Sequence, residues 1–64
     1  MADRELDEKI FGILEVKGLT FSELLKRVQE ERPLSIKLAL DRLEKDERVM
    51  RVVREGKYTW DAVK

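Results

Sequence analysis

The chain has 64 residues, so we expect one domain, residues 1–64, with a single small core. It contains no cysteine and no histidine, which excludes a disulfide framework, a thiolate metal site and the commonest general base. No apolar run approaches the ~18 residues that a membrane span needs, and the N-terminus does not resemble a signal peptide. The sequence therefore predicts a soluble, cytoplasmic protein without a cofactor.

Charged residues make up 44% of the sequence, yet 14 basic and 14 acidic side chains cancel. Asparagine is absent and Gln29 is the only glutamine. Dense mixed charge with few thermolabile residues is typical of proteins from hot environments, so we predict a thermophilic source. Sampling variation in a small chain that is mostly surface is the alternative.

Residues 3–17 predict an amphipathic helix with acidic side chains in its first turns, where the helix dipole favours them. Apolar residues recur at the helical spacing i, i+4, i+7, i+8: Leu6, Ile10, Ile13 and Leu14. Gly18 stands where a left-handed cap would end this helix.

A second helix is expected over about residues 21–30. Thr20 and Glu23 have the spacing of a capping box, in which each side chain accepts a hydrogen bond from the backbone of the other. The apolar side of this helix is Phe21, Leu24, Leu25 and Val28.

A third helix is expected from Pro33, which fits a first helical turn because its missing amide costs nothing there. One face is apolar: Ile36, Ala39, Leu40 and Leu43. The opposite face is assigned to Lys37, Leu38, Asp41, Arg42 and Lys45.

Residues 49–60 predict a β-hairpin with Glu55 and Gly56 as its two-residue turn. In this register Val53 opposes Tyr58, and Arg51 opposes Trp60, on whose indole it is expected to stack. We expect one hairpin face to pack on the helices: Val49, Val53, Tyr58 and Trp60. The other face is expected to meet water: Val52, Arg54, Lys57 and Thr59. Tyr58 and Trp60 then close the core rather than stack on bases.

The predicted fold class is α+β and mostly helical, a three-helix bundle with a helix-turn-helix and a C-terminal hairpin. The segments LTFSELLKRV, LSIKLALDRLEKDERVMRV and REGKYTW resemble, in this order, the winged helix-turn-helix DNA-binding domain. REGKYTW is similar to the wing of ArsR- and MarR-like bacterial and archaeal regulators. The resemblance covers nearly the whole chain.

The resemblance implies a small transcriptional regulator that binds double-stranded DNA, with the third helix in the major groove and the wing on the flanking backbone. Carried over by position, it nominates Ser35, Lys37, Leu38, Asp41, Arg42 and Lys45 on the helix. On the wing it nominates Arg51, Arg54 and Lys57. Arginine reads guanine edges, lysine neutralises phosphates, and a leucine rests on a thymine methyl.

Charge supports this hypothesis only at the C-terminal end. Residues 49–64 hold four basic and two acidic side chains, a net of +2, whereas residues 1–19 hold three basic and five acidic, a net of −2. Lys37 and Asp41 also have the i, i+4 spacing of an ordinary solvated ion pair. Arg54 and Lys57 have a second interpretation, as charges that keep the hairpin edge from pairing with another chain.

The two alternative functional classes are a protein-binding module and an enzyme. A winged-helix module that binds another protein is favoured by the zero net charge and by Leu38 on the outward face. Phe11 and Val16 in the first helix would supply an apolar patch, which could also be the seam of a homodimer. An enzyme acting on a small molecule is rejected. The sequence has no catalytic constellation and no glycine-rich phosphate loop, and so short a chain is expected to lack a pocket of ~300 Å³.

Overall fold

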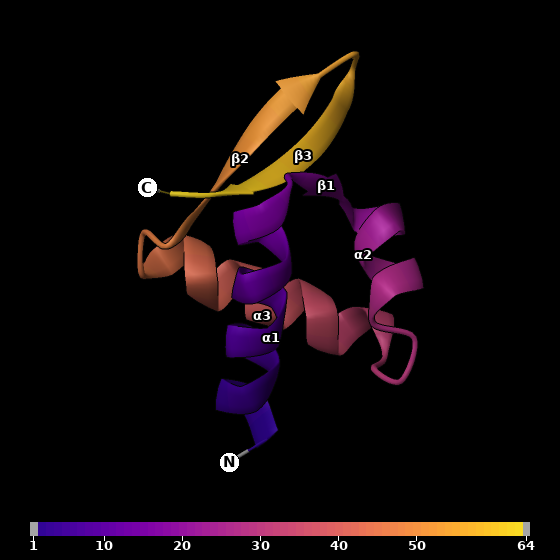
Figure 1. The fold of residues 1–64 in the computed structure, drawn as a ribbon, viewed down its shortest axis with the longest axis vertical. Coiled ribbons are helices and arrows are strands. Elements are labelled where there is room, and N and C mark those ends of the chain that lie inside the picture. Colours follow the sequence, from indigo (N-terminus) through magenta and orange to yellow (C-terminus); the bar gives the residue numbers. More distant parts are fainter. Residues whose placement is uncertain (1, 64) are drawn as a thin grey trace.

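The computed structural model describes residues 2–63, which form three helices and one three-stranded antiparallel sheet (Figure 1). In chain order these are α1 (Ala2–Val16), β1 (Leu19–Thr20), α2 (Phe21–Arg27), α3 (Pro33–Lys45), β2 (Val49–Arg54) and β3 (Lys57–Ala62). The strands lie in the order β1-β3-β2. The α+β class and the hairpin are confirmed, whereas the short strand β1 was not predicted. None of the helices in the described residues is long and apolar enough to cross a membrane.

The core is built from the helical stripes that the sequence predicts. The four apolar residues assigned to the inner face of α3 are all buried, and so are Leu6, Ile10 and Leu14 of α1. Ile13 is only partly buried and packs against the edge of this cluster. Val49 and Trp60 extend the core into the sheet. Helical periodicity therefore identifies the core of the helices, because residues three and four apart share a face.

Gly18 has a different role from the one expected. Its φ is not in the left-handed region, where only Glu47, Glu55 and Gly56 lie among the described residues. A Cβ placed on Gly18 would instead lie 1.6 Å from Oδ1 of Asp61 and 3.2 Å from the backbone oxygen of Trp60. The missing side chain lets β3 approach the end of α1. The predicted left-handed cap is wrong, although the need for glycine is real.

Helix α2 begins as predicted and ends early. The Glu23 amide donates to the Thr20 hydroxyl at 3.2 Å, and the Thr20 amide donates to the Glu23 carboxylate at 2.9 Å, so the capping box is confirmed. The helix ends at Arg27 rather than near residue 30. Val28 turns into the core, and Arg32 is extended because it precedes Pro33.

A Schellman motif ends α3 and directs the chain into β2. The Arg48 amide donates to the Leu43 carbonyl and the Glu47 amide to the Glu44 carbonyl, both at 2.9 Å. Glu47 takes the left-handed conformation that the motif requires, with a φ of 61°. This turn brings Arg48 back towards α1.

The hairpin register is confirmed. Val53 pairs with Tyr58 and Arg51 with Trp60, around a turn at Glu55 and Gly56. Both turn residues have positive φ, 52° and 77°, which defines the type I′ turn whose twist matches that of the strands.

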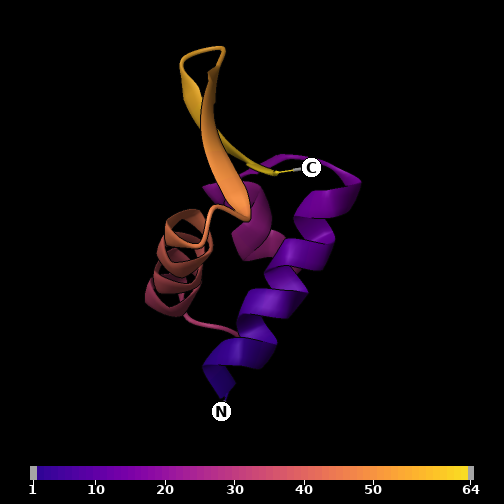
Figure 2. The same cartoon turned by 90° about the vertical axis from the view of Figure 1, so that its left-hand side faces the viewer.

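The predicted division of the hairpin into an apolar and a polar face is wrong in its outer half. Val53 and Tyr58 are 63% and 57% exposed, because the hairpin tip extends past the helices (Figure 2). Thr59, which was expected to face water, is buried, because β1 pairs beside it through Thr20. Of the two aromatic residues expected to close the core, only Trp60 does so.

Two glycine substitutions test this account of packing. We expect Gly18→Ala to lower the free energy of unfolding by roughly 1 kcal/mol, since the Asp61 side chain must move and Trp60 O stays close. Gly12→Ala is the matched control: Gly12 is exposed in α1 with nothing within 4 Å of the added Cβ, so stability should rise by up to ~1 kcal/mol. Urea unfolding followed by Trp60 fluorescence measures both. Equal effects of the two substitutions would contradict the close approach at Gly18.

Candidate nucleic-acid interface

The outward face of α3 is a narrow stripe with mixed chemistry. Leu38 and Lys45, seven residues apart, lie on this face with Asp41 between them, and all three are exposed. Lys37 lies at its margin and forms an ion pair with Asp41, with Nζ 3.6 Å from Oδ1. Leu34 belongs to the same stripe because it is one turn before Leu38, although the resemblance does not nominate it.

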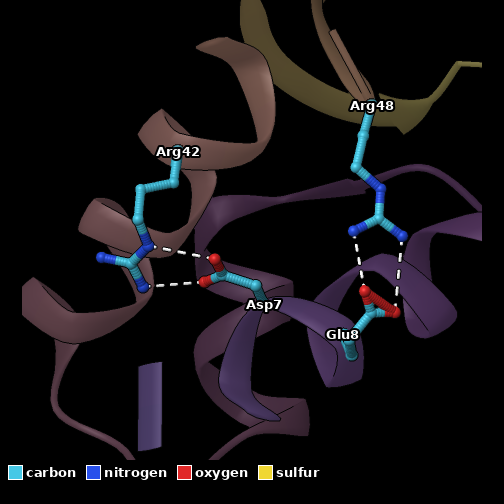
Figure 3. A network of polar contacts seen from close by, with 4 residues as sticks. All are labelled: Asp7, Glu8, Arg42 and Arg48. Atoms are coloured by element: carbon cyan, nitrogen blue, oxygen red, sulfur yellow. Dashed lines mark hydrogen bonds and ion pairs between the residues drawn. The ribbon is translucent and has the colours of Figure 1, made fainter. Parts of the chain in front are cut away.

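Arg42 does not belong to this outward face, contrary to expectation. Its Nε and Nη2 donate to the two carboxylate oxygens of Asp7 in α1, at 3.0 and 2.7 Å (Figure 3). Ser35, seven residues earlier on the same side of α3, is only partly exposed. Arg42 therefore joins α3 to α1.

Arg51 lies on the sheet face that looks towards α3, and its partners differ from the expected one. Its Nε lies 3.4 Å from Oε1 of Glu44, and its guanidinium carbon lies 5.2 Å from the centroid of the Tyr58 ring. The expected stacking on Trp60 is wrong. The Trp60 indole nitrogen instead donates to the same Glu44 oxygen at 2.8 Å.

Arg54 and Lys57 lie on the opposite face of the hairpin from Arg51. The two pair across the turn, and side chains alternate between the faces along each strand. The Arg54 guanidinium donates to Asp61 Oδ2 at 3.0 Å. The three nominated wing residues are therefore split between two faces that share one projecting tip.

An open crevice of about 730 Å³ lies on this second face, between the hairpin, β1 and the start of α2. Its charged lining is Lys17, Glu23, Arg54, Glu55 and Lys57. The expectation that so short a chain has little volume for a pocket of ~300 Å³ is wrong, because this open crevice is larger. Among the described residues, no group of three or more acidic side chains is placed to hold a metal ion.

Intramolecular ion pairs engage most of the nominated cations. Lys37, Arg42, Arg51 and Arg54 each pair with a carboxylate of the chain. No ion pair within the described part of the chain involves Lys45 or Lys57. Sequence spacing identifies the Lys37 pair, but the other three join segments whose proximity only the fold creates.

Further ion pairs hold α1 to the rest of the molecule. Arg48 Nη1 donates to Glu8 Oε1 at 2.7 Å (Figure 3), and Lys9 pairs with Glu30. The hydrogen bond from Arg48 and its positive charge lower the pKa of Glu8, and the hydrogen bond from Lys9 lowers that of Glu30. The backbone hydrogen bond from Thr20 in the capping box lowers the pKa of Glu23. These carboxylates stabilise the fold in their ionised form.

The apolar patch expected from Phe11 and Val16 is reduced to one residue. Phe11 packs against the core, and the Arg48 guanidinium carbon lies 4.1 Å from its ring centroid. Val16 is 88% exposed at the end of α1.

Comparisons of the chain with protein-family models, with curated proteins and with solved structures find no match.

The role of Arg42 is testable against that of Lys45, its neighbour on α3. We expect Arg42→Met to lower the free energy of unfolding by about 1 kcal/mol, because it leaves the half-buried Asp7 carboxylate without its bidentate donor. Lys45→Met, on the exposed stripe, should stay within about 0.5 kcal/mol. Chemical denaturation compares the two, and an unchanged stability in Arg42→Met would argue against a structural role.

The ion pairs also predict how stability depends on pH. Because the folded-state pKa of Glu8 is lowered, its contribution is complete above the unfolded-state value of about 4.3 and disappears as pH falls through the folded value. We expect Tm to fall on acidification from pH 7 to pH 3, and less steeply in Glu8→Gln. Glu5→Gln, an exposed neighbour in α1, is the control and should keep the wild-type profile. Identical profiles for all three proteins would refute this role of Glu8.

Proposed function

We propose that this chain is a winged helix-turn-helix protein that binds double-stranded DNA, with α3 in the major groove and the β2–β3 hairpin on the flanking backbone. A small cytoplasmic regulator of transcription is the role that fits such a domain. The chain order helix, strand, helix, helix, hairpin and the sheet order β1-β3-β2 support the fold part of the proposal.

One observation carries the functional part. The hairpin projects on the same side of the molecule as α3, away from α1 (Figure 2). A duplex that received the exposed stripe of α3 in its major groove would therefore meet the hairpin tip along its backbone. Lys37 and Lys45 on α3, and Arg51, Arg54 and Lys57 on the hairpin, are the cations that this docking brings to phosphates.

DNA binding would require some ion pairs to exchange partners. The Arg54 side chain is largely exposed, so it can leave Asp61 for a phosphate at little cost in buried charge. Lys57 is exposed and needs no such exchange. The zero net charge of the chain then predicts modest affinity that depends steeply on salt.

A salt titration tests the proposal. Fluorescence anisotropy of a labelled mixed-sequence duplex should show binding that weakens between about 50 and 200 mM salt. Arg54→Ala should reduce the steepness of the plot of log binding constant against log salt concentration by about one. Asp61→Asn removes the competing carboxylate, so it should tighten binding. Arg4→Ala is the charge-matched control, since Arg4 is exposed in α1 at the end of the molecule remote from the hairpin. It should change neither the affinity for the duplex nor its salt dependence.

A second function, docking of another protein on the same surface, is favoured by one specific observation. Leu34 and Leu38 are 67% and 47% exposed on the α3 stripe, whereas the DNA hypothesis gives a base contact to Leu38 alone. Exposed leucines one turn apart suit an apolar protein groove. Absence of any duplex binding at the lower salt concentration would reject the DNA hypothesis and leave this one.

A further inference from the structure

The outer edge of β2 is open. β2 is the last strand of the sheet, since β3 separates it from β1. In Figure 2 no other segment lies in front of this strand. Edge strands present unpaired amide and carbonyl groups that pair readily with another strand.

The hairpin geometry identifies which backbone groups face outward. In an antiparallel pair, residues alternate between those that bond to the partner strand and those that do not. The Val63 amide donates to the Arg48 carbonyl at 2.8 Å, and Arg54 pairs with Lys57 across a two-residue turn. Arg48, Met50, Val52 and Arg54 therefore bond inward. The amide and carbonyl groups of Val49, Arg51 and Val53 point away from the sheet.

This edge lacks most of the features that usually prevent pairing. Residues 49–54 contain no proline or lysine, and their register with β3 continues without a bulge. Met50 and Val53 are exposed beside the open edge. Arg51 and Arg54 carry charge, but each already has a carboxylate partner in its own chain.

We propose that two copies of this chain associate through their β2 edges, which pair antiparallel to form one continuous sheet. The register that pairs all three outward residues has a two-fold axis at Arg51 and sets Val49 opposite the partner's Val53. Met50 then opposes the partner's Val52 on the other face. Like charges meet at Arg51 and at both ends of the seam, where Arg54 opposes the partner's Arg48. Each of these arginines has a carboxylate of its own chain beside it: Glu44 for Arg51, Asp61 for Arg54 and Glu8 for Arg48.

The edge is self-complementary, which favours a second copy over an unrelated strand. Both faces of the seam would gain β-branched or apolar cross-strand pairs, the unit that stabilises sheets. A domain of this size has a thin stability margin, and with no cysteine for disulfides, association is one of the remaining ways to increase it. A two-fold axis perpendicular to the sheet also puts α3 of both copies on the same side.

Oligomeric state in solution tests the proposal without DNA, so the result is independent of the proposed DNA binding. Sedimentation equilibrium should give a dimer for the unmodified chain and for Arg51→Ala, which keeps the outward amide. Compared with Arg51→Ala, Arg51→Pro additionally removes the outward backbone N–H, and Val53→Lys places a positive charge at the seam. Both variants should have the mass of the monomer. Trp60 fluorescence and far-UV circular dichroism verify that the variants remain folded.

A cysteine probe tests the register. Directly opposed residues of a hydrogen-bonded antiparallel pair have Cα atoms about 5.5 Å apart, within the range of a disulfide. Since the chain has no cysteine of its own, Arg51→Cys should oxidise to a covalent dimer much faster than Val16→Cys, whose position at the end of α1 is 88% exposed. A monomeric unmodified chain, or a dimer lost in Val16→Lys and retained in Arg51→Pro and Val53→Lys, would overturn the proposal.

Discussion

Trp60 is the point at which the helices and the sheet are held together. Its backbone pairs with Leu19 of β1 and with Arg51 of β2. Its side chain lies 6.4 Å, between ring centroids, from Phe21 of α2 and donates a hydrogen bond to Glu44 of α3. An isolated hairpin is marginal in water, so this contact is what fixes the direction in which the hairpin leaves the helices. The relative placement of hairpin and α3, on which both proposals depend, follows from it.

Glu44 links this packing to the electrostatics of the surface. One carboxylate oxygen accepts from the indole and also lies beside the Arg51 guanidinium. The ion pair with this half-buried carboxylate keeps Arg51 near α3. The same principle holds α1 through Asp7 and Glu8. Many of the charged side chains thus form ion pairs within the chain, including four of the six cations nominated for DNA binding.

Local rules predict much of this fold, and contacts between distant segments account for the rest. The capping box, the α3 stripe and the hairpin register depend on spacings of a few residues, so they can be read directly. β1 has only two residues and no periodicity, and it exists because Trp60 and Thr59 supply its partner strand. Gly18 carries no sign that Asp61 lies against it.

The errors at the candidate site have the same origin. Helical position alone does not assign Arg42, because it lies at the border of the exposed face and Asp7, 35 residues earlier, decides its direction. Strand alternation correctly groups Tyr58 with Trp60, but it does not indicate where the helices beneath the hairpin stop. How far the hairpin extends beyond the helices depends on tertiary packing, which the strand pattern does not show.

Under the proposed strand pairing, the exposed outer half of the hairpin would lie against a second copy of the chain. The core of so small a domain is small, and burying Val53 and Tyr58 would stabilise it, yet both side chains are exposed to water. A DNA backbone is polar and charged, so contact with phosphates through Arg54 and Lys57 would leave these apolar groups largely uncovered. Their place on the α3-facing side of the sheet, with Val53 on the open β2 edge, lets a second strand bury Val53 while the cations of the tip stay accessible. In the two proposals, strand pairing uses the outward backbone groups of β2, and DNA contact uses the side chains of Arg54 and Lys57. Arg51, which would lie at the seam, is the hairpin cation that both proposals involve.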